Sequence, residues 1–304
     1  MKDNSKRELY FLTGLPRSGT TWLADILGTH ESFNYLSGEI FNPGTSKNTF
    51  GLNNLPWYIH SSKMTEQLEE QIPKALSINF SLSFFLQRVS ILIRERNFNP
   101  KNYGKIIKHT YYSLNKKAIF TKDPTGFLLV PYLNQKLNAK IVIIKRNPYR
   151  FIASMKRMNW FFDFNCLPEL YSKKFEDEIA AYRNSGKEDI VHNSIILWQI
   201  FECFLLDLKK DCISFYEINH ETIMENPHKE VSQILAFFGE KMDSSVRKKI
   251  AFYQNQKGEK KNKKEETHNM LRTKAAVMKS WKEQLSEEDL ILIREKTGHE
   301  PIEL

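Results

Sequence analysis

Two patterns of apolar residues alternate along the chain: short continuous apolar runs, and apolar residues at helical spacing. Their alternation predicts strands interleaved with helices. Short apolar runs bounded by turn residues predict buried strands at residues 9–12, 118–121, 141–145 and 213–216. The run 141–145 is the clearest, because it is apolar on both faces like a strand inside a parallel sheet. Apolar residues at helical spacing predict helices at residues 20–27, 65–96, 128–137, 149–156, 195–208 and 229–238.

Strands that alternate with helices predict an α/β fold of three layers, in which helices flank a central, mostly parallel sheet. The length of 304 residues suits one domain of this kind. No internal repeat or interdomain linker interrupts residues 1–304, so we expect a single domain. Stretches rich in turn-forming or polar residues predict loops at 37–51 and 255–269.

The composition narrows the class of protein without choosing a ligand. Hydrophobic residues make up 41% of the chain, which excludes a disordered protein. The net charge of +9 suits a nucleotide, an acidic substrate or a membrane surface. The lysine-rich run at 257–264 is interpreted as a solvated loop. The N-terminus has no long apolar stretch, so we expect no signal peptide, no transmembrane anchor and a cytoplasmic location.

Cysteines and aromatic pairs add little positive information. Three cysteines without close spacing, Cys166, Cys203 and Cys212, predict neither a disulfide framework nor a zinc site. The aromatic pairs at 57–58 and 111–112 have no RNA-binding signature around them, so nucleic-acid binding is not expected. These pairs fit either an acceptor pocket or the core.

The residues after the first predicted strand form the most informative motif. The run Gly14-Leu15-Pro16-Arg17-Ser18-Gly19-Thr20-Thr21 leads from a strand into a helix, where backbone N–H groups bind phosphate. The spacing of its two glycines matches a Walker A loop, but Thr20 stands where an ATP-binding loop needs lysine. Arg17 instead places a cation inside the loop. Such a loop suits one terminal anionic group better than a triphosphate with magnesium, which argues against a P-loop nucleotide kinase.

The same motif resembles the 5′-phosphosulfate loop of the sulfotransferase superfamily, whose donor is 3′-phosphoadenylyl sulfate (PAPS). The resemblance implies that the donor contacts Pro16, Arg17, Ser18, Gly19, Thr20, Thr21 and Trp22. After the predicted strand 141–145, Arg146 and Ser154 have the spacing of the family's 3′-phosphate pair. Further similar segments lie at 122–124, 216–218 and 281–285, and the match is closer to bacterial and protein-tyrosine enzymes than to the cytosolic small-molecule type.

The resemblance implies direct in-line transfer of a sulfuryl group from PAPS to an acceptor hydroxyl, without a metal, releasing 3′-phosphoadenosine 5′-phosphate (PAP). Arg17 and Lys122 are the expected cations for the leaving phosphate and the sulfuryl group. Asp123 either orients Lys122 or caps the following helix. The remaining candidates for donor binding, chosen by position, are Tyr216, Arg272, Thr273 and Lys274. A non-catalytic nucleotide-binding protein on the same fold is the other alternative, and the intact cations argue against it.

The general base is inferred from the same resemblance. Pro124 stands where cytosolic sulfotransferases carry their catalytic histidine. Gly38-Glu39 resembles the pattern of tyrosine-directed enzymes, so Glu39 is the expected base, with His30 and His109 as runners-up. Residues 52–115 and 159–191 match no family segment and are expected to bind the acceptor, a small-molecule, glycan or lipid hydroxyl. The acceptor's identity and the oligomeric state, a homodimer included, stay open.

Overall fold

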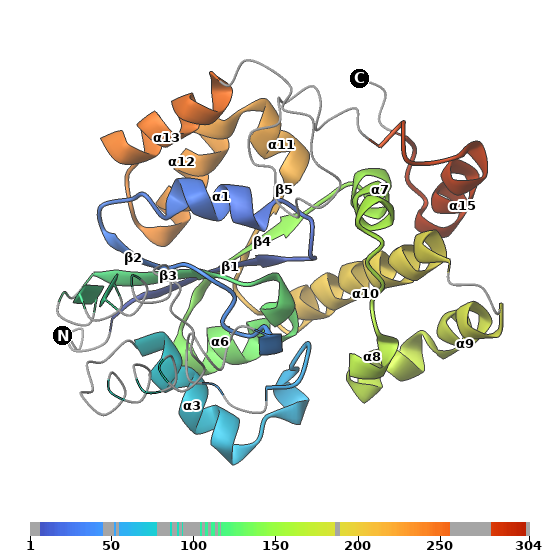
Figure 1. Cartoon of the computed structure of the whole chain (residues 1–304), viewed down its shortest axis with the longest axis horizontal. Helices are drawn as coiled ribbons and strands as arrows, with labels where there is room; N and C mark the ends of the chain where they lie inside the picture. The colour runs from blue at the N-terminus through green and yellow to red at the C-terminus, as the bar shows by residue number, and fades with distance from the viewer. Residues whose placement is uncertain are drawn as a thin grey trace.

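The structure is a computed structural model, and it describes residues 7–44, 52, 55–77, 117–185, 189–255 and 281–301, with isolated residues between 86 and 115. Five strands form one parallel sheet in the order β2-β3-β1-β4-β5 (Figure 1). The strands are β1 (Leu9–Gly14), β2 (Phe33–Leu36), β3 (Ala118–Lys122), β4 (Lys140–Lys145) and β5 (Tyr216–Asn219). The predicted α/β fold with a central parallel sheet is confirmed.

Helices cover both faces of the sheet, because alternate strand residues enter two separate hydrophobic cores. Phe11 and Ile143 belong to one core, whereas Leu12 and Val142 belong to the other. The first core is covered by α3 (Glu66–Ser77), α6 (Val130–Leu137), α7 (Pro148–Met158), α8 (Glu169–Lys174), α9 (Glu176–Asn184), α10 (Ile190–Lys210) and α15 (Glu287–Thr297), with the short 3-10 helices η1 (Ser61–Lys63), η2 (Pro124–Leu129) and η3 (Phe164–Cys166). The second core is covered by α1 (Thr20–Leu27), α11 (His220–Glu225), α12 (Pro227–Phe238) and α13 (Ser244–Gln254).

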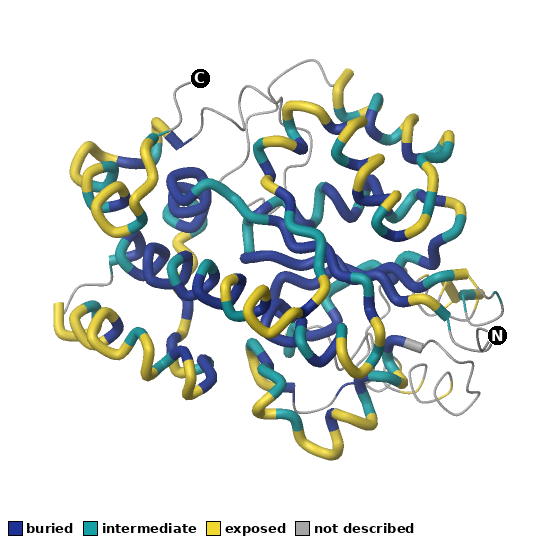
Figure 2. The backbone as a smooth tube through the Cα atoms, turned by 180° about the vertical axis from the view of Figure 1, so that it is seen from behind, coloured by how far each residue is buried: buried dark blue, intermediate teal, exposed yellow. Residues whose placement is uncertain are grey.

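Burial follows this layering. Strands β1 to β4 are buried along most of their length, the edge strand β5 is mostly part-exposed, and the outer helices expose one side to solvent (Figure 2). Helix α10 is apolar and long enough to cross a membrane by length and composition alone, but 67% of its most apolar window is buried inside the molecule. That burial is typical of a core helix packed against α7, so its composition is weak support for a membrane span.

Most predicted elements occur with shifted ends. The helix predicted at 20–27 matches α1, and the glycine after 229–238 does end α12 in a left-handed cap. The strand predicted at 213–216 is wrong in its bounds, because β5 begins where that prediction ends. Ile213 donates its N–H to Leu208 at 2.9 Å and therefore belongs to the turn that closes α10. Strand β2 was not predicted. The predicted helix 65–96 begins as α3, and most of its remainder lies outside the described residues.

Gly14 sets how closely β1 and β4 approach each other. It pairs with Ile144 and has a φ of 153°. A methyl group at this position would overlap the backbone carbonyl of Ile144. The last residue of β1 must therefore be glycine for the following loop to start at this point of the sheet.

Gly14→Ala is expected to lower the free energy of unfolding by about 2 kcal/mol, because the added carbon must displace the backbone of a central strand. Urea denaturation followed by circular dichroism measures the loss. Gly44→Ala is the matched control, since Gly44 is exposed and its added carbon would meet only the flexible Asn42 side chain. Equal stability of the two variants would show that the contact at Gly14 is relaxed at little cost.

Candidate active site

The carboxyl ends of all five strands meet at one edge of the sheet, and the candidate residues lie there. Arg17 follows β1, Glu39 follows β2, Lys122 ends β3, and Arg146 follows β4. Because the strands are parallel, four segments from distant parts of the sequence share this carboxyl edge (Figure 1). Ligands of open α/β sheets bind at this edge.

The loop after β1 turns sharply into α1. Arg17 has a φ of 70° and Gly19 a φ of 91°, both in the left-handed region. Ser18 donates its N–H to Leu15 at 3.1 Å, and Leu23 makes the first helical hydrogen bond, to Gly19. The N–H groups of the residues between Gly19 and Leu23 therefore have no acceptor within the helix, as at any helix N-terminus. This end of α1 is suited to an anion.

Arg17, Arg146 and Ser154 converge on this loop. Arg17 Nε donates to Ser154 Oγ at 3.2 Å, across 137 residues of sequence. Arg146 Nη1 donates to the carbonyl oxygen of Arg17. Arg17 comes from the motif after β1, and Arg146 and Ser154 come from the motif after β4. The structure brings these three side chains together.

Arg146 stays charged at this position. Burial lowers its pKa to about 10, with the neighbouring Arg17 lowering it further and Glu221 opposing the change. A guanidinium with that pKa is protonated at neutral pH. Its Nε has no hydrogen-bond partner among the described residues, and its backbone carbonyl accepts from Trp198 Nε1 at 3.2 Å. The side chain is therefore held at the loop with one donor unused.

Three further residues join the loop that the sequence motifs did not indicate. His220, directly after β5, packs its ring so close to Gly19 that any side chain there would overlap it. Arg150 is 2% exposed, and its Nη1 lies 3.3 Å from Glu221 Oε1. Burial lowers the pKa of His220 well below its usual value, and Arg146 and Arg150 lower it further, so this imidazole is neutral. The one sequence signal for Arg150 was its position four residues after Arg146 and four residues before Ser154.

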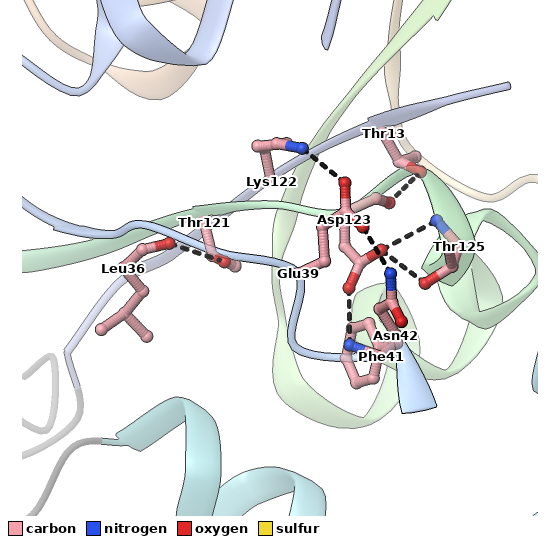
Figure 3. A network of polar contacts seen from close by, with 9 residues as sticks. All are labelled: Thr13, Leu36, Glu39, Phe41, Asn42, Thr121, Lys122, Asp123 and Thr125. Carbon is pink, nitrogen blue, oxygen red and sulfur yellow. Dashed lines mark hydrogen bonds and ion pairs between the residues drawn. The ribbon is translucent and has the colours of Figure 1, made fainter. Parts of the chain in front are cut away.

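Glu39 and Lys122 form an ion pair beside the loop, with Lys122 Nζ 2.8 Å from Glu39 Oε1 (Figure 3). The other oxygen, Oε2, accepts from Asn42 Nδ2 at 2.8 Å. Lys122 is 5% exposed and lies level with Leu12 of β1. The expected base and an expected cation are therefore in direct contact, although 83 residues separate them.

Asp123 fixes the position of the Glu39 loop. It is fully buried, and its Oδ1 accepts from the backbone N and the hydroxyl of Thr125 at 2.8 and 2.6 Å. Its Oδ2 accepts from the backbone N of Phe41 at 2.5 Å (Figure 3). Of the two roles left open by the sequence, the structure shows the cap, here of η2, together with an anchor for the loop that carries Glu39.

Other candidates lie elsewhere. Tyr216 is at the start of β5, opposite Val142, and its hydroxyl lies 3.2 Å from Gln233 Oε1 of α12, so the structure does not bring it to the loop. The Trp22 ring packs against Tyr253 of α13. His30 contacts the Lys241 carbonyl through Nε2 and accepts from Ser32 through Nδ1, both away from Lys122. The candidates outside the described residues are His109, Arg272, Thr273 and Lys274.

The fold and this edge define an α/β protein with a glycine-containing loop suited to an anion and four cationic side chains at the same edge: Arg17, Lys122, Arg146 and Arg150. No cluster of three His, Cys, Asp or Glu side chains that could hold a metal occurs within the described part of the chain. A family model described as "Sulfotransferase family" matches residues 10–244. The chain therefore belongs to the sulfotransferase family.

Individual relatives are distant. Nodulation protein NoeE of Sinorhizobium fredii is 23% identical over 234 residues, which are 75% of this chain and 49% of NoeE. The chain thus spans about half the length of that curated relative. The sulfotransferase domain of the Synechococcus PCC 7002 olefin synthase is similar at 16% identity and a TM-score of 0.49, over 99% of both chains. Mouse sulfotransferase SULT7A1, solved in complex with PAP, is similar at 17% identity and a TM-score of 0.47, over 96% of this chain and 84% of its own.

The buried carboxyl of Asp123 predicts a pH dependence of stability. Burial raises its pKa to about 7, with the charge of Glu39 adding to the rise and the hydrogen bonds from Thr125 and Phe41 opposing it. An unfolded chain titrates this carboxyl near pH 4, to order of magnitude. The stabilising contribution of the raised pKa is therefore full below about pH 4 and is lost as the pH rises to about 7.

Asp123→Asn removes this titration. The difference in the free energy of unfolding, wild type minus variant, should therefore decrease between about pH 4 and pH 7 and stay constant above about pH 7. Urea denaturation of both proteins at a series of pH values measures it. Asp243→Asn is the control of opposite sign: burial raises the pKa of Asp243, but hydrogen bonds from Val246 and Glu31 outweigh it and lower the pKa overall. An Asp123 difference that does not change with pH would contradict the assignment.

Proposed function

We propose that residues 1–304 form one catalytic domain that transfers a sulfuryl group from PAPS to an acceptor hydroxyl. One observation carries the proposal. Arg17, Arg146 and Ser154 meet at a loop in which Thr20 replaces the lysine of ATP-binding loops. Family membership supports the transferase class. The 5′-phosphosulfate of the donor would bind at the N-terminus of α1, and the 3′-phosphate would bind beside Arg146 and Ser154.

In the proposed reaction, the acceptor hydroxyl gives its proton to Glu39, and its oxygen forms a bond to the donor's sulfur. The bond between that sulfur and the 5′-phosphate oxygen breaks, and PAP leaves with the electron pair. Lys122 and Arg17 stabilise the negative charge that develops on the leaving oxygen. The 2.8 Å contact between Lys122 and Glu39 supports these roles, because it holds the base and a cation at one point of the carboxyl edge.

The alternative bases have less support. Pro124 begins η2 and cannot accept a proton. His30 precedes β2, whereas Glu39 follows it, and both imidazole nitrogens of His30 already have backbone contacts. Glu39 also receives a hydrogen bond from Asn42, which orients the carboxylate. These contacts favour Glu39 as the general base.

Exposed aromatic side chains beside the site support an acceptor that carries a ring. The Arg17 guanidinium lies 5.5 Å from the centre of the Trp160 ring, and Trp160 and Phe161 are each 37% exposed. Phe162 packs against Tyr58 at 4.7 Å, which connects this segment to the exposed Trp57. Aromatic faces of this kind stack on sugar or aromatic rings. The contacts of residues 57–58 and 160–162, which belong to the segments that matched no family motif, therefore support an acceptor that binds on this side of the loop.

The first experiment measures nucleotide binding by calorimetry in EDTA. PAP is expected to bind about 10–100-fold more tightly than ATP, because it offers a 3′-phosphate to Arg146 and needs no magnesium. Arg146→Ala should remove most of that preference by weakening PAP alone. Equal affinities, or ATP binding that requires magnesium, would contradict the proposal and favour a kinase.

The second experiment tests the base. Glu39→Gln should lower kcat by roughly 10²–10⁴-fold and leave PAP affinity within a few-fold of the wild type. Turnover is measured with labelled PAPS and the fastest acceptor from a panel of phenols, sugars and aliphatic alcohols. Glu39→Asp is the matched control, because it keeps the carboxylate on a side chain that is one methylene shorter. It should retain part of the activity. Near-normal turnover of Glu39→Gln would assign proton removal to another residue.

A further inference from the structure

A second buried ion pair lies directly behind the loop, between the first turns of α7 and α11. Arg150 Nη1 is 3.3 Å from Glu221 Oε1, and the same oxygen accepts from the backbone N of Asn147 at 3.3 Å. His220 Nδ1 lies 4.0 Å from it. The side chains of Arg150 and Glu221 are 1% and 12% exposed. Glu221 therefore joins the start of α7 to the end of β5.

Arg150 shares a helix face with Ser154, one of the proposed 3′-phosphate residues. The two are four residues apart in α7, and residues four apart lie one above the other on a helix. Arg146, the other proposed 3′-phosphate residue, stands two residues before the first residue of α7. In the sequence, Arg150 therefore lies midway between the two residues that the family resemblance assigned to the phosphate.

Several side-chain nitrogen atoms of this cluster lack hydrogen-bond partners within the described part of the chain. Arg150 Nε, Nη1 and Nη2, Arg146 Nε and His220 Nδ1 are all buried without a hydrogen-bond partner among the described residues. The approach of Arg150 to Glu221 thus lacks the geometry of a hydrogen bond. Buried donors without acceptors are costly, and guanidinium groups match phosphate oxygens in two-point contacts. Unsatisfied donors gathered from two arginines at one point indicate an acceptor that comes from outside the chain.

We propose that Arg150 is a second cation of the 3′-phosphate site, and that Glu221 is its counter-ion while the site is empty. The proposal rests on the proposed use of PAPS. When the 3′-phosphate binds, its oxygens accept from Arg146 and Arg150, and the Arg150–Glu221 contact loosens. Glu221 keeps its hydrogen bond from Asn147 and so continues to hold the start of α7.

The charge balance explains why a carboxylate belongs here. Burial lowers the pKa of Arg146 most, and the positive charge of Arg150 lowers it further. Glu221 opposes that effect and makes two buried guanidinium groups tolerable in the empty protein. The arriving phosphate replaces part of this compensation with a larger negative charge.

The test compares PAP with adenosine 5′-monophosphate (AMP), which differs by lacking the 3′-phosphate. The measured quantity is the ratio of the AMP dissociation constant to the PAP dissociation constant, for the wild type, Arg150→Gln, Glu221→Gln and the double variant. Arg150→Gln should lower the ratio by at least about tenfold, the effect of one hydrogen bond to a charged group, with AMP affinity unchanged.

The double variant Arg150→Gln with Glu221→Gln distinguishes contact from charge balance. It removes one positive and one negative charge, so the net charge of the cluster equals that of the wild type. If Arg150 binds the phosphate, the ratio stays about tenfold low. If Arg150 serves only to neutralise Glu221, the ratio returns to the wild-type value, and this result overturns the proposal.

Glu221→Gln alone gives an independent readout that does not depend on an Arg150 variant folding. This variant should bind PAP more tightly than the wild type does, with its AMP affinity unchanged. Its melting temperature without ligand should be lower than that of the wild type, and PAP should restore much of the loss. An unchanged ratio in Glu221→Gln counts against the counter-ion role. A wild-type ratio near one would instead refute the proposed use of PAPS, so the two failures are distinguishable.

Discussion

Parallel alignment of five strands is the constraint on which the candidate site depends. In a parallel sheet every strand ends at the same edge, so segments from residues 17 to 221 reach one region without long excursions of the chain. The close approach of β1 and β4 at Gly14 fixes where the loop begins. Arg17, Ser154 and Arg146 then meet because their elements are adjacent in the sheet and in the helix layer above it.

Excess positive charge at this edge is the second organising feature. Arg17, Lys122, Arg146 and Arg150 face two compensating carboxylates, Glu39 and Glu221. Burying cations costs free energy unless they are paired and hydrogen-bonded. The fold tolerates this cost with two ion pairs, one on each side of the loop. The proposed donor, which carries anionic groups at both its 5′ and 3′ positions, would add negative charge at this edge.

The two ion pairs differ in what holds them. Glu39 stands on a loop whose position depends on Asp123, which accepts from Phe41 of that loop and from Thr125 of η2. Glu221 stands on the first turn of a helix directly after a strand and bonds to Asn147. The first pair therefore belongs to a segment that a buried carboxyl anchors to the end of β3, and the second joins the first turns of α7 and α11. Both carboxylates are thus held in position by hydrogen bonds, as the proposed roles of Glu39 and Glu221 require.

Local patterns in the sequence determined the strands β1, β3 and β4, helix α1, the phosphate-type loop and the spacing of Arg146 and Ser154. They did so because strand burial, helix periodicity and glycine turns act over a few residues. Only the tertiary structure decided which side chains meet. It placed Lys122 against Glu39, put His220 and Glu221 behind the loop, kept Tyr216 at the far end of β5, and moved that strand past the turn that closes α10. The contact of Lys122 with Glu39 joins residues 83 positions apart, and the contact of His220 with Gly19 joins residues still further apart, which no local pattern encodes. The shift of β5 follows instead from a local turn that the apolar run did not reveal.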